Sequence, residues 1–227
     1  MEKDLSNKTY VVTGATSGIG LAAAEALVQA GAVVLGVGRS IERCQDAEKR
    51  LNALKSNGQA RYFSANLGIQ EEVNLLAEKI IKHQAALGKI SLDGLVNNAG
   101  VFTYWFTLTP DGIETQWAVN HLAPFLLTRR LLPLLRNASP ARVVTVSSDS
   151  HYGARLDWND LMLRRHYQCL RAYSNTKLAN ILFTLELNQR SGSNSTLRAF
   201  AVDPGLVKTD IGLKGTPPFS RWIWKLR

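Results

Sequence analysis

The segment TGATSGIG, residues 13–20, lies between a short apolar run and the first long helical pattern of the chain. The run at residues 9–13 predicts a β-strand, and residues 19–30 predict the helix that follows it. Glycines at this junction allow a tight turn, and they let backbone N–H groups approach a pyrophosphate at the positive end of the helix. A plain glycine-rich turn is the alternative, but the strand–turn–helix context favours a dinucleotide-binding site.

The rest of the chain repeats this alternation of β-rich runs and helical patterns. Strands are predicted at residues 9–13, 33–38, 60–64, 94–97, 142–147 and 197–202, and helices at 19–30, 41–55, 71–87, 113–136 and 173–189. Pro124 and Pro133 are expected to kink or end the fourth of these helices. Such alternation implies parallel strands joined by right-handed helical crossovers. We therefore predict an α/β fold, a doubly wound Rossmann-type sheet of about six strands in the order 3-2-1-4-5-6.

Composition predicts a single globular domain over residues 1–227. Hydrophobic residues make up 45% and charged residues 20% of the chain, which are ordinary values for a domain with a substantial core. No apolar run approaches the roughly 18 residues of a membrane span, and the polar N-terminus does not resemble a signal peptide. Cys44 and Cys169 are expected to be reduced thiols. These features together predict a cytoplasmic protein.

The net charge of +9 raises the question of an anionic partner. Lysines and arginines are scattered, and no recognition motif accompanies them, so nucleic acid is not an expected partner. No cluster of histidine, cysteine and carboxylate residues has the spacing of a metal site. The charge is therefore interpreted as solvated surface, with one or two positions serving phosphate groups.

Arg39 follows the second predicted strand, where a dinucleotide-binding fold contacts the adenosine ribose. An acidic residue there would bind the ribose 2′-hydroxyl of NAD and repel a 2′-phosphate. The first acidic residue is Glu42, whereas Arg39 is available to grip a phosphate through two parallel hydrogen bonds. We therefore predict NADP(H) in preference to NAD(H). A surface arginine without a ligand is the alternative.

Tyr173 and Lys177 stand four residues apart at the start of the last predicted helix. Side chains at this spacing lie on one helix face, so the ammonium is expected beside the phenol. A free tyrosine has a pKa of about 10, and a neighbouring cation lowers it by favouring the phenolate. The pair alone occurs often by chance, but a nucleotide signature in the same chain makes an acid–base role its favoured interpretation.

With these motifs in hand, the chain resembles the short-chain dehydrogenase/reductase family. Besides the glycine turn and the Tyr-x-x-x-Lys pair, the matches are N-N-A-G at residues 97–100, an asparagine at 120, a serine at 148 and P-G-x-V-x-T at 204–209. They occur in the family's order and cover residues 9–210. Residues 119–128 (VNHLAPFLLT), residues 177–180 (KLAN) and the long separation of Ser148 from Tyr173 resemble the retinol dehydrogenase-like branch.

The resemblance implies an NAD(P)-dependent enzyme that interconverts an alcohol and a carbonyl compound, with NADP(H) preferred and a lipophilic substrate of retinoid, steroid or aldehyde type. Tyr173 would exchange a proton with the substrate oxygen, Lys177 would lower its pKa, Ser148 would orient the substrate, and Asn120 would hold a relay water. The implied cofactor contacts are Gly14, Thr16, Ser17, Gly18, Ile19, Gly20, Arg39, Asn66, Leu67, Asn98, Ala99, Gly100, Tyr173, Lys177, Pro204, Gly205, Val207 and Thr209.

Some positions keep an alternative. Ser147 competes with Ser148 as the outward-facing serine, and Asn120 is alternatively a buried amide tied to the backbone. Asn66 stands where the family usually has an aspartate beside adenine, and its side-chain carbonyl can still accept a hydrogen bond from the adenine amino group. Family members also often pair through the two long helices, so a homodimer is an additional expectation.

The C-terminal region departs from the family. Residues 205–227 look like a truncated substrate-loop region, and the family's last helix and seventh strand are expected to be missing. The aromatic and basic residues 219–227 suggest peripheral membrane contact, a partner contact or the start of a substrate-loop helix. The alternative function is therefore a truncated, weak or inactive family member that binds a nucleotide or a partner protein.

Overall fold

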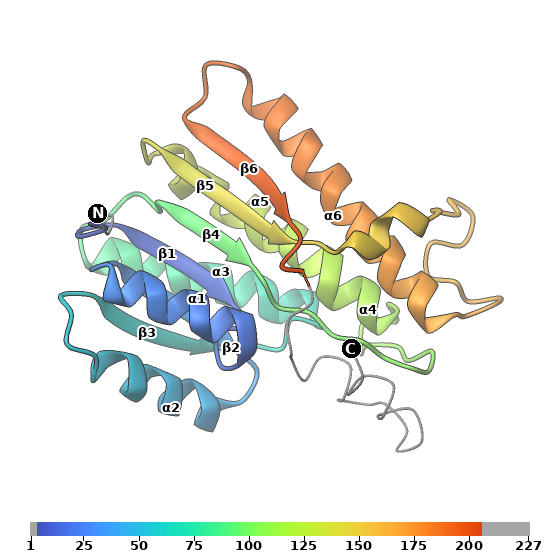
Figure 1. Cartoon of the computed structure of the whole chain (residues 1–227), viewed down its shortest axis with the longest axis horizontal. Helices are drawn as coiled ribbons and strands as arrows, with labels where there is room; N and C mark the ends of the chain where they lie inside the picture. Colours follow the sequence, from blue (N-terminus) through green and yellow to red (C-terminus); the bar gives the residue numbers. More distant parts are fainter. Residues whose placement is uncertain (1–3, 206–227) are drawn as a thin grey trace.

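A computed structural model describes residues 4–205 of the chain. Its centre is a six-stranded parallel sheet in the order β3-β2-β1-β4-β5-β6, which confirms the predicted topology. The strands are β1 (Thr9–Thr13), β2 (Val33–Gly38), β3 (Gln59–Ser64), β4 (Gly94–Asn97), β5 (Ala141–Val146) and β6 (Leu197–Val202). Parallel pairing brings the carboxyl ends of all six strands to one edge of the sheet (Figure 1).

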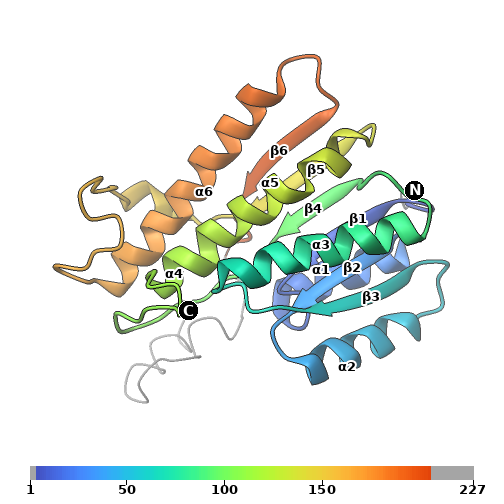
Figure 2. The ribbon, with the colours of Figure 1, turned by 180° about the vertical axis from the view of Figure 1, so that it is seen from behind.

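The helices cover both faces of the sheet, as predicted. Helices α1 (Gly18–Gln29) and α2 (Ile41–Asn52) lie on one face, and α3 (Gln70–Ala86), α5 (Ala123–Arg136) and α6 (Cys169–Ser191) lie on the other (Figures 1 and 2). Successive residues of β1 show why two cores form: Val11 packs with α3 and α5, whereas Val12 packs with α1 and α2. Because strand side chains alternate between faces, both must be apolar in a strand that is buried on both sides.

The predicted helix at residues 113–136 is interrupted. A short α4 (Thr115–Trp117) continues into a π-helical turn, η1 (Ala118–Leu122), before α5 begins at Ala123. Pro124 occupies the first turn of α5, where its missing N–H matters least, and Pro133 lies inside the helix without ending it. Single π-helical turns often occur at functional sites, and this one contains Asn120.

Asparagine side chains bond to the backbone of the two outermost strands of the sheet, β3 and β6. The Asn52 amide donates to the Ala60 carbonyl and accepts from the Ala60 N–H on β3, and Asn188 makes the same two bonds with Ala199 on β6. These bonds occupy backbone groups that would otherwise pair with another chain. The predicted C-terminal features at residues 206–227, including the expected membrane or partner contact, lie outside the described residues.

Candidate active site

The glycine turn is held in place from the neighbouring strand. The Asn98 amide donates to the Thr13 carbonyl at 2.9 Å, and the Thr13 hydroxyl accepts from the N–H groups of Asn98 and Ala99, both at 3.0 Å. A Cβ atom on Gly20 would lie 2.3 Å from the Asn98 amide nitrogen and 2.4 Å from the Gly14 carbonyl oxygen. The glycines therefore make room for Asn98 beneath the turn, a role that adds to the predicted one toward a phosphate.

The start of α1 has the features of an anion site. Its N-cap residue, Ser17, makes no side-chain hydrogen bond to the helix among residues 4–205, and no acidic residue lies in the first turn. Gly14 and Gly18 have φ values of +66° and +54°, which glycine adopts without strain. The first N–H groups of α1 are thus left for a ligand, as a pyrophosphate would require.

The predicted adenosine side lies at the ends of β2 and β3. The Arg39 side chain is exposed, and its guanidinium forms no ion pair with the described part of the chain, so it is available to an anion. Asn66 accepts from the Gly68 N–H at 3.1 Å through its side-chain oxygen. That bond uses one of the two lone pairs of the oxygen that is predicted to accept from adenine. Leu67 is partly buried against the core.

Tyr173 and Lys177 lie together on α6, in its second and third turns. The Lys177 ammonium nitrogen is 5.2 Å from the centre of the Tyr173 ring and donates a 2.9 Å hydrogen bond to the Val146 carbonyl at the end of β5. On another side, the Phe102 ring meets Tyr173 edge to face at 5.9 Å. The helix spacing and the strand end thus bring the predicted pair to the carboxyl edge of the sheet.

The two candidate serines have different surroundings. Ser147 is buried and its hydroxyl donates to the Lys177 carbonyl at 3.0 Å, which ties β5 to α6. Ser148 caps the 3₁₀ helix η2 (Asp149–Gly153): its hydroxyl accepts from the Ser150 N–H at 3.3 Å and lies 3.2 Å from an Asp149 carboxylate oxygen. This difference favours Ser148 as the serine available to a substrate.

Burial shifts the pKa values of both Tyr173 and Lys177. It raises the pKa of Tyr173 to about 12, and the charges of Asp203 and Asp149 act in the same direction. Burial also lowers the pKa of Lys177 to about 8, opposed by the charge of Asp203. Desolvation of the phenolate thus decides the direction of the Tyr173 shift in the protein alone, and the lowering of this pKa by Lys177 stays a prediction.

We expect Lys177→Met to raise the free energy of unfolding at pH 7. A Lys pKa lowered from 10.5 to about 8 corresponds to roughly 3 kcal/mol of burial penalty at about 1.4 kcal/mol per unit, and methionine avoids it. Between pH 8 and 10.5 the unfolded state binds more protons at Lys177, so wild-type stability rises with pH and the difference shrinks. Urea unfolding at pH 7 and pH 9.5 measures this, and equal stability at pH 7 would contradict it.

The Asn120 side chain bonds mainly to the backbone, with one further 3.4 Å bond from its nitrogen to the Thr176 hydroxyl. It accepts from the Val101 N–H at 2.7 Å and donates to the Val101 carbonyl at 2.9 Å, which fixes the loop after β4 against the π-helical turn. The amide is 1% exposed. The side chain is thus a buried amide tied to the backbone, as in the alternative role, and the predicted relay water at Asn120 stays a prediction.

Two acidic residues near the site were not predicted as site residues. Asp203 follows β6 and accepts from the Asp149 N–H at 3.0 Å and from the Gly205 N–H at 2.9 Å, so it joins the segment after β6 to η2. Glu114 is 1% exposed, caps α4 and accepts from the Tyr167 hydroxyl at 3.1 Å. Burial raises the Glu114 pKa. A single acidic residue in a sequence carries no signal for either contact.

The remaining predicted cofactor residues are placed as follows. Thr16, Ile19 and Gly100 lie in or beside the glycine turn and the end of β4, and Pro204 and Gly205 follow β6 at the same edge of the sheet. Val207 and Thr209 lie outside the described residues. In the insertion before α6, Tyr152 and Trp158 are 86% and 76% exposed, so their side chains are available at the surface.

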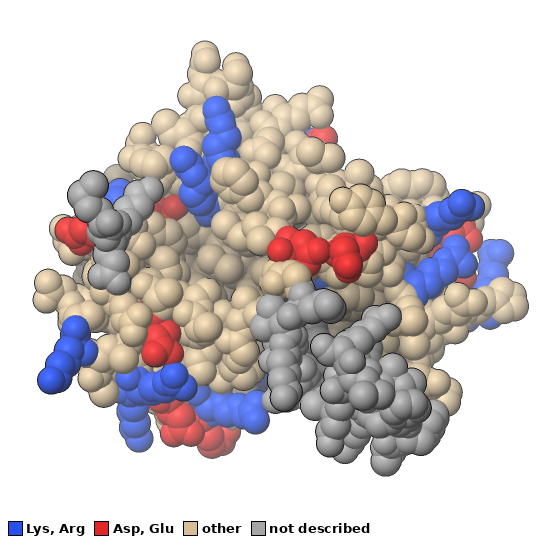
Figure 3. All heavy atoms as spheres, viewed as in Figure 1, with Lys and Arg blue, Asp and Glu red and all other residues tan. Residues whose placement is uncertain are grey.

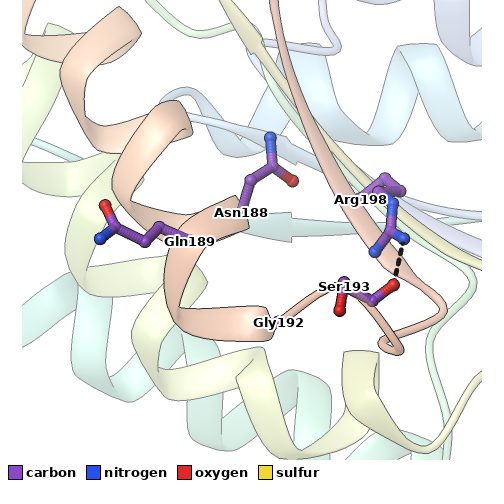
Figure 4. A pocket seen from close by; sticks show the side chains of 5 residues that line it. All are labelled: Asn188, Gln189, Gly192, Ser193 and Arg198. Atoms are coloured by element: carbon purple, nitrogen blue, oxygen red, sulfur yellow. Dashed lines mark hydrogen bonds between the residues drawn. The ribbon is translucent and has the colours of Figure 1, made fainter.

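One hollow in the surface lies away from this site. It has a volume of about 320 Å³ and is lined by Asn188, Gln189, Gly192, Ser193 and Arg198 (Figure 4). The Arg198 guanidinium donates to the carbonyls of Ser193, Ser195 and Leu197, so its donors close the α6–β6 loop. The candidate site is therefore identified by its chemistry and by strand topology, and not by this hollow.

Surface charge and helix composition do not point to a second functional site among residues 4–205. Lys and Arg side chains lie in separate groups on the face in Figure 3, with acidic residues among them. Over residues 4–205, no helix is both long and apolar enough to cross a bilayer. The same residues hold no cluster of three or more histidine, cysteine or carboxylate side chains that could bind a metal.

Comparison with known proteins places this geometry in a family. The short chain dehydrogenase family model matches residues 8–216. Human retinol dehydrogenase 11 is 36% identical over 98% of this chain and 67% of its own length, and bovine retinol dehydrogenase 12 is 36% identical over 91% and 64%. The chain therefore spans about two thirds of the length of these relatives.

Solved structures agree with the sequence relatives. An uncharacterized protein from Mycobacterium Paratuberculosis has a TM-score of 0.77 at 35% identity, covering 94% of this chain and 74% of its own. A short chain dehydrogenase from Escherichia coli CFT073, solved as a complex with NADPH, has a TM-score of 0.74 at 26% identity, covering 96% and 85%. The chain belongs to the short-chain dehydrogenase family, in its retinol dehydrogenase-like branch, and is an NAD(P)-dependent dehydrogenase acting on CH–OH groups.

Proposed function

We propose that the chain is an NADP(H)-dependent oxidoreductase that interconverts a lipophilic alcohol and its carbonyl compound, with Tyr173 as the acid and base. The observation that carries the proposal is the pair of half-buried Tyr173 and buried Lys177 at the same end of the sheet as the glycine turn. Ligands of doubly wound folds bind across the carboxyl ends of the strands. A dinucleotide lying there would extend from the start of α1 toward Tyr173.

The residues present fit such a cofactor. The uncapped start of α1 suits the pyrophosphate, exposed Arg39 suits a 2′-phosphate, and the glycines allow the backbone to approach closely. When bound, the cofactor supplies or accepts the hydride. The chain's own residues bind the cofactor, orient the substrate and move one proton.

The ionisation of Tyr173 favours carbonyl reduction at neutral pH. With a pKa raised to about 12, the phenol is protonated and can donate its proton to the oxygen of a carbonyl as that oxygen gains negative charge. Ser148 would hold the same oxygen through its hydroxyl before the charge develops. Lys177, still largely charged below its pKa of about 8, then stabilises the phenolate that remains.

The direct test is turnover by the purified chain. NADPH oxidation would be followed with retinal, steroid ketones and medium-chain aldehydes, and NADPH and NADH affinity would be measured separately by fluorescence. The proposal expects turnover with at least one lipophilic carbonyl compound and tighter binding of NADPH. Binding without turnover across the panel would favour the alternative, a nucleotide- or partner-binding protein, and no binding of either cofactor would remove the proposal entirely.

Cofactor choice is expected to depend on Arg39. Arg39→Gln should weaken NADPH binding by about 10–100-fold, since a charge-assisted hydrogen bond contributes roughly 1.5–3 kcal/mol, and should leave NADH binding unchanged. Arg50→Gln is the matched control, because Arg50 is engaged with Glu25 at 2.8 Å. Titration of both cofactors measures the ratio. An equal loss of affinity for NADPH and NADH would show that Arg39 does not recognise the 2′-phosphate.

A further inference from the structure

Asn180 of α6 is a buried residue whose side-chain amide bonds to a carbonyl that Lys177 also contacts. Its side-chain nitrogen donates to the Asn120 carbonyl at 2.9 Å and to the Val146 carbonyl at 3.5 Å, and the residue is 1% exposed. The Val146 carbonyl also accepts the 2.9 Å bond from Lys177. Asn180 and Lys177 therefore share one acceptor.

That shared acceptor lies at the carboxyl end of the sheet, where Val146 is paired with Val202 of β6. Val146 is the last residue of β5, and the chain leaves the sheet after it. The Asn120 carbonyl belongs to the π-helical turn η1, whose hydrogen bonding is irregular. Both carbonyls accept from the Asn180 side chain, so this one amide helps to fix the direction of each.

His121 orients Asn180 from the opposite side. Its Nδ1 lies 3.0 Å from the Asn180 side-chain oxygen, and because that amide's nitrogen already donates to two carbonyls, its oxygen is the acceptor and His121 Nδ1 is the donor. Burial lowers the His121 pKa, so the ring is neutral, and the Trp117 ring packs against it at 5.1 Å. The orientation of the Asn180 amide is therefore defined.

We propose that Asn180, oriented by His121, is a positioning residue that directs the Val146 and Asn120 carbonyls and thereby holds the Lys177 ammonium beside Tyr173. The inference rests on the proposed function of that pair. The other ionisable groups acting there are Asp203, after β6, on Lys177, and Asp203 and Asp149 on Tyr173. A misplacement of about 1 Å can cost 10²-fold in rate, so a residue outside the reacting atoms can have a large effect.

The first test replaces Asn180 with leucine, which has a similar volume and no amide. We expect kcat for carbonyl reduction to fall about 10–100-fold, with NADPH affinity changed by less than about threefold. Thr184→Val is the matched control, because the buried Thr184 hydroxyl, one turn further along α6, donates only to the Asn180 backbone carbonyl at 2.8 Å. This variant should keep kcat.

The second test uses rescue at His121. His121→Gln keeps an N–H donor for Asn180 and should retain most of kcat, whereas His121→Leu, which lacks one, should approach the effect of Asn180→Leu. If Asn180→Leu does not fold, these two His121 variants test whether the orientation of the Asn180 amide affects kcat. Equal kcat in His121→Gln and His121→Leu would overturn the role of His121 in orienting Asn180.

A third measurement does not depend on turnover. Nitrogen-15 NMR of the Lys177 side chain gives its titration midpoint. In Asn180→Leu this midpoint should move to higher pH, because the Val146 carbonyl then accepts from the Lys177 side chain without competition from Asn180. In Thr184→Val it should stay unchanged. A wild type that binds NADPH but shows no turnover contradicts the proposed function, and the NMR comparison then decides the inference. If Asn180→Leu loses only thermal stability, with kcat and the midpoint unchanged, Asn180 is structural and the inference is wrong.

Discussion

Tyr173→Phe is expected to lower kcat for carbonyl reduction by at least about 10²–10⁴-fold, the contribution of a positioned proton donor, while NADPH affinity stays within a few-fold of wild type. Phenylalanine keeps the ring that packs against Phe102 and beneath the Lys177 ammonium. Only the hydroxyl is lost. The change therefore separates proton transfer from binding, and steady-state kinetics together with fluorescence titration measure both.

Tyr10→Phe is the matched control for this substitution. Tyr10 lies on β1 toward the end of the sheet opposite the catalytic pair, and its ring packs over Gly94. Removing its hydroxyl should leave kcat unchanged. If Tyr173→Phe retained wild-type kcat, the proton would have to come from another group, and the acid–base role of Tyr173 would be excluded.

The pH dependence of the reaction rate is a second test of the acid–base role of Tyr173. A Tyr173 pKa raised to about 12 means that the phenolate fraction increases about tenfold per pH unit over the neutral range. Alcohol oxidation needs the phenolate, so its rate should rise with pH, whereas carbonyl reduction needs the phenol and should not. In Tyr173→Phe the residual oxidation rate should lose this slope.

The sequence alone predicted the strand order. It also predicted that the main candidate site residues lie together at the carboxyl ends of the strands. Alternating β-rich and helical segments required parallel strands, which the structure has, and the glycine turn pointed to the carboxyl ends of the strands as the candidate cofactor site. Spacing of four residues correctly predicted that Tyr173 and Lys177 share a helix face. These features depend on local patterns that a single sequence displays.

What the sequence did not predict depends on contacts between distant segments. The direction of the Tyr173 pKa shift follows first from burial of the phenol and then from the charges of Asp203 and Asp149, which other segments of the chain contribute. The π-helical turn at Asn120 has no periodicity of its own that differs visibly from an α-helix. Residue spacing describes one element at a time, so it gives neither result.

Gly20→Ala is expected to abolish tight cofactor binding and to destabilise the fold. The added Cβ would lie 2.4 Å from the Gly14 carbonyl oxygen and 2.3 Å from the Asn98 amide nitrogen, where real Cβ atoms are essentially never found. Overpacking of this kind costs roughly 1–3 kcal/mol. Displacing Asn98 also breaks its 2.9 Å bond to the Thr13 carbonyl, which shapes the turn that meets the phosphates.

The chain offers a matched control and a partial rescue. Gly153→Ala adds the same methyl group where no atom lies within 4 Å and φ is ordinary, so NADPH affinity and the unfolding midpoint should not change. Adding Asn98→Ala to Gly20→Ala removes the clash with the amide but leaves the clash with the Gly14 carbonyl. The double variant should therefore recover stability only in part. It should still bind NADPH at least about tenfold more weakly than wild type. Wild-type affinity in Gly20→Ala would mean that the turn can move without losing the phosphate site, and the close fit between Asn98 and the glycines would then have no role in binding.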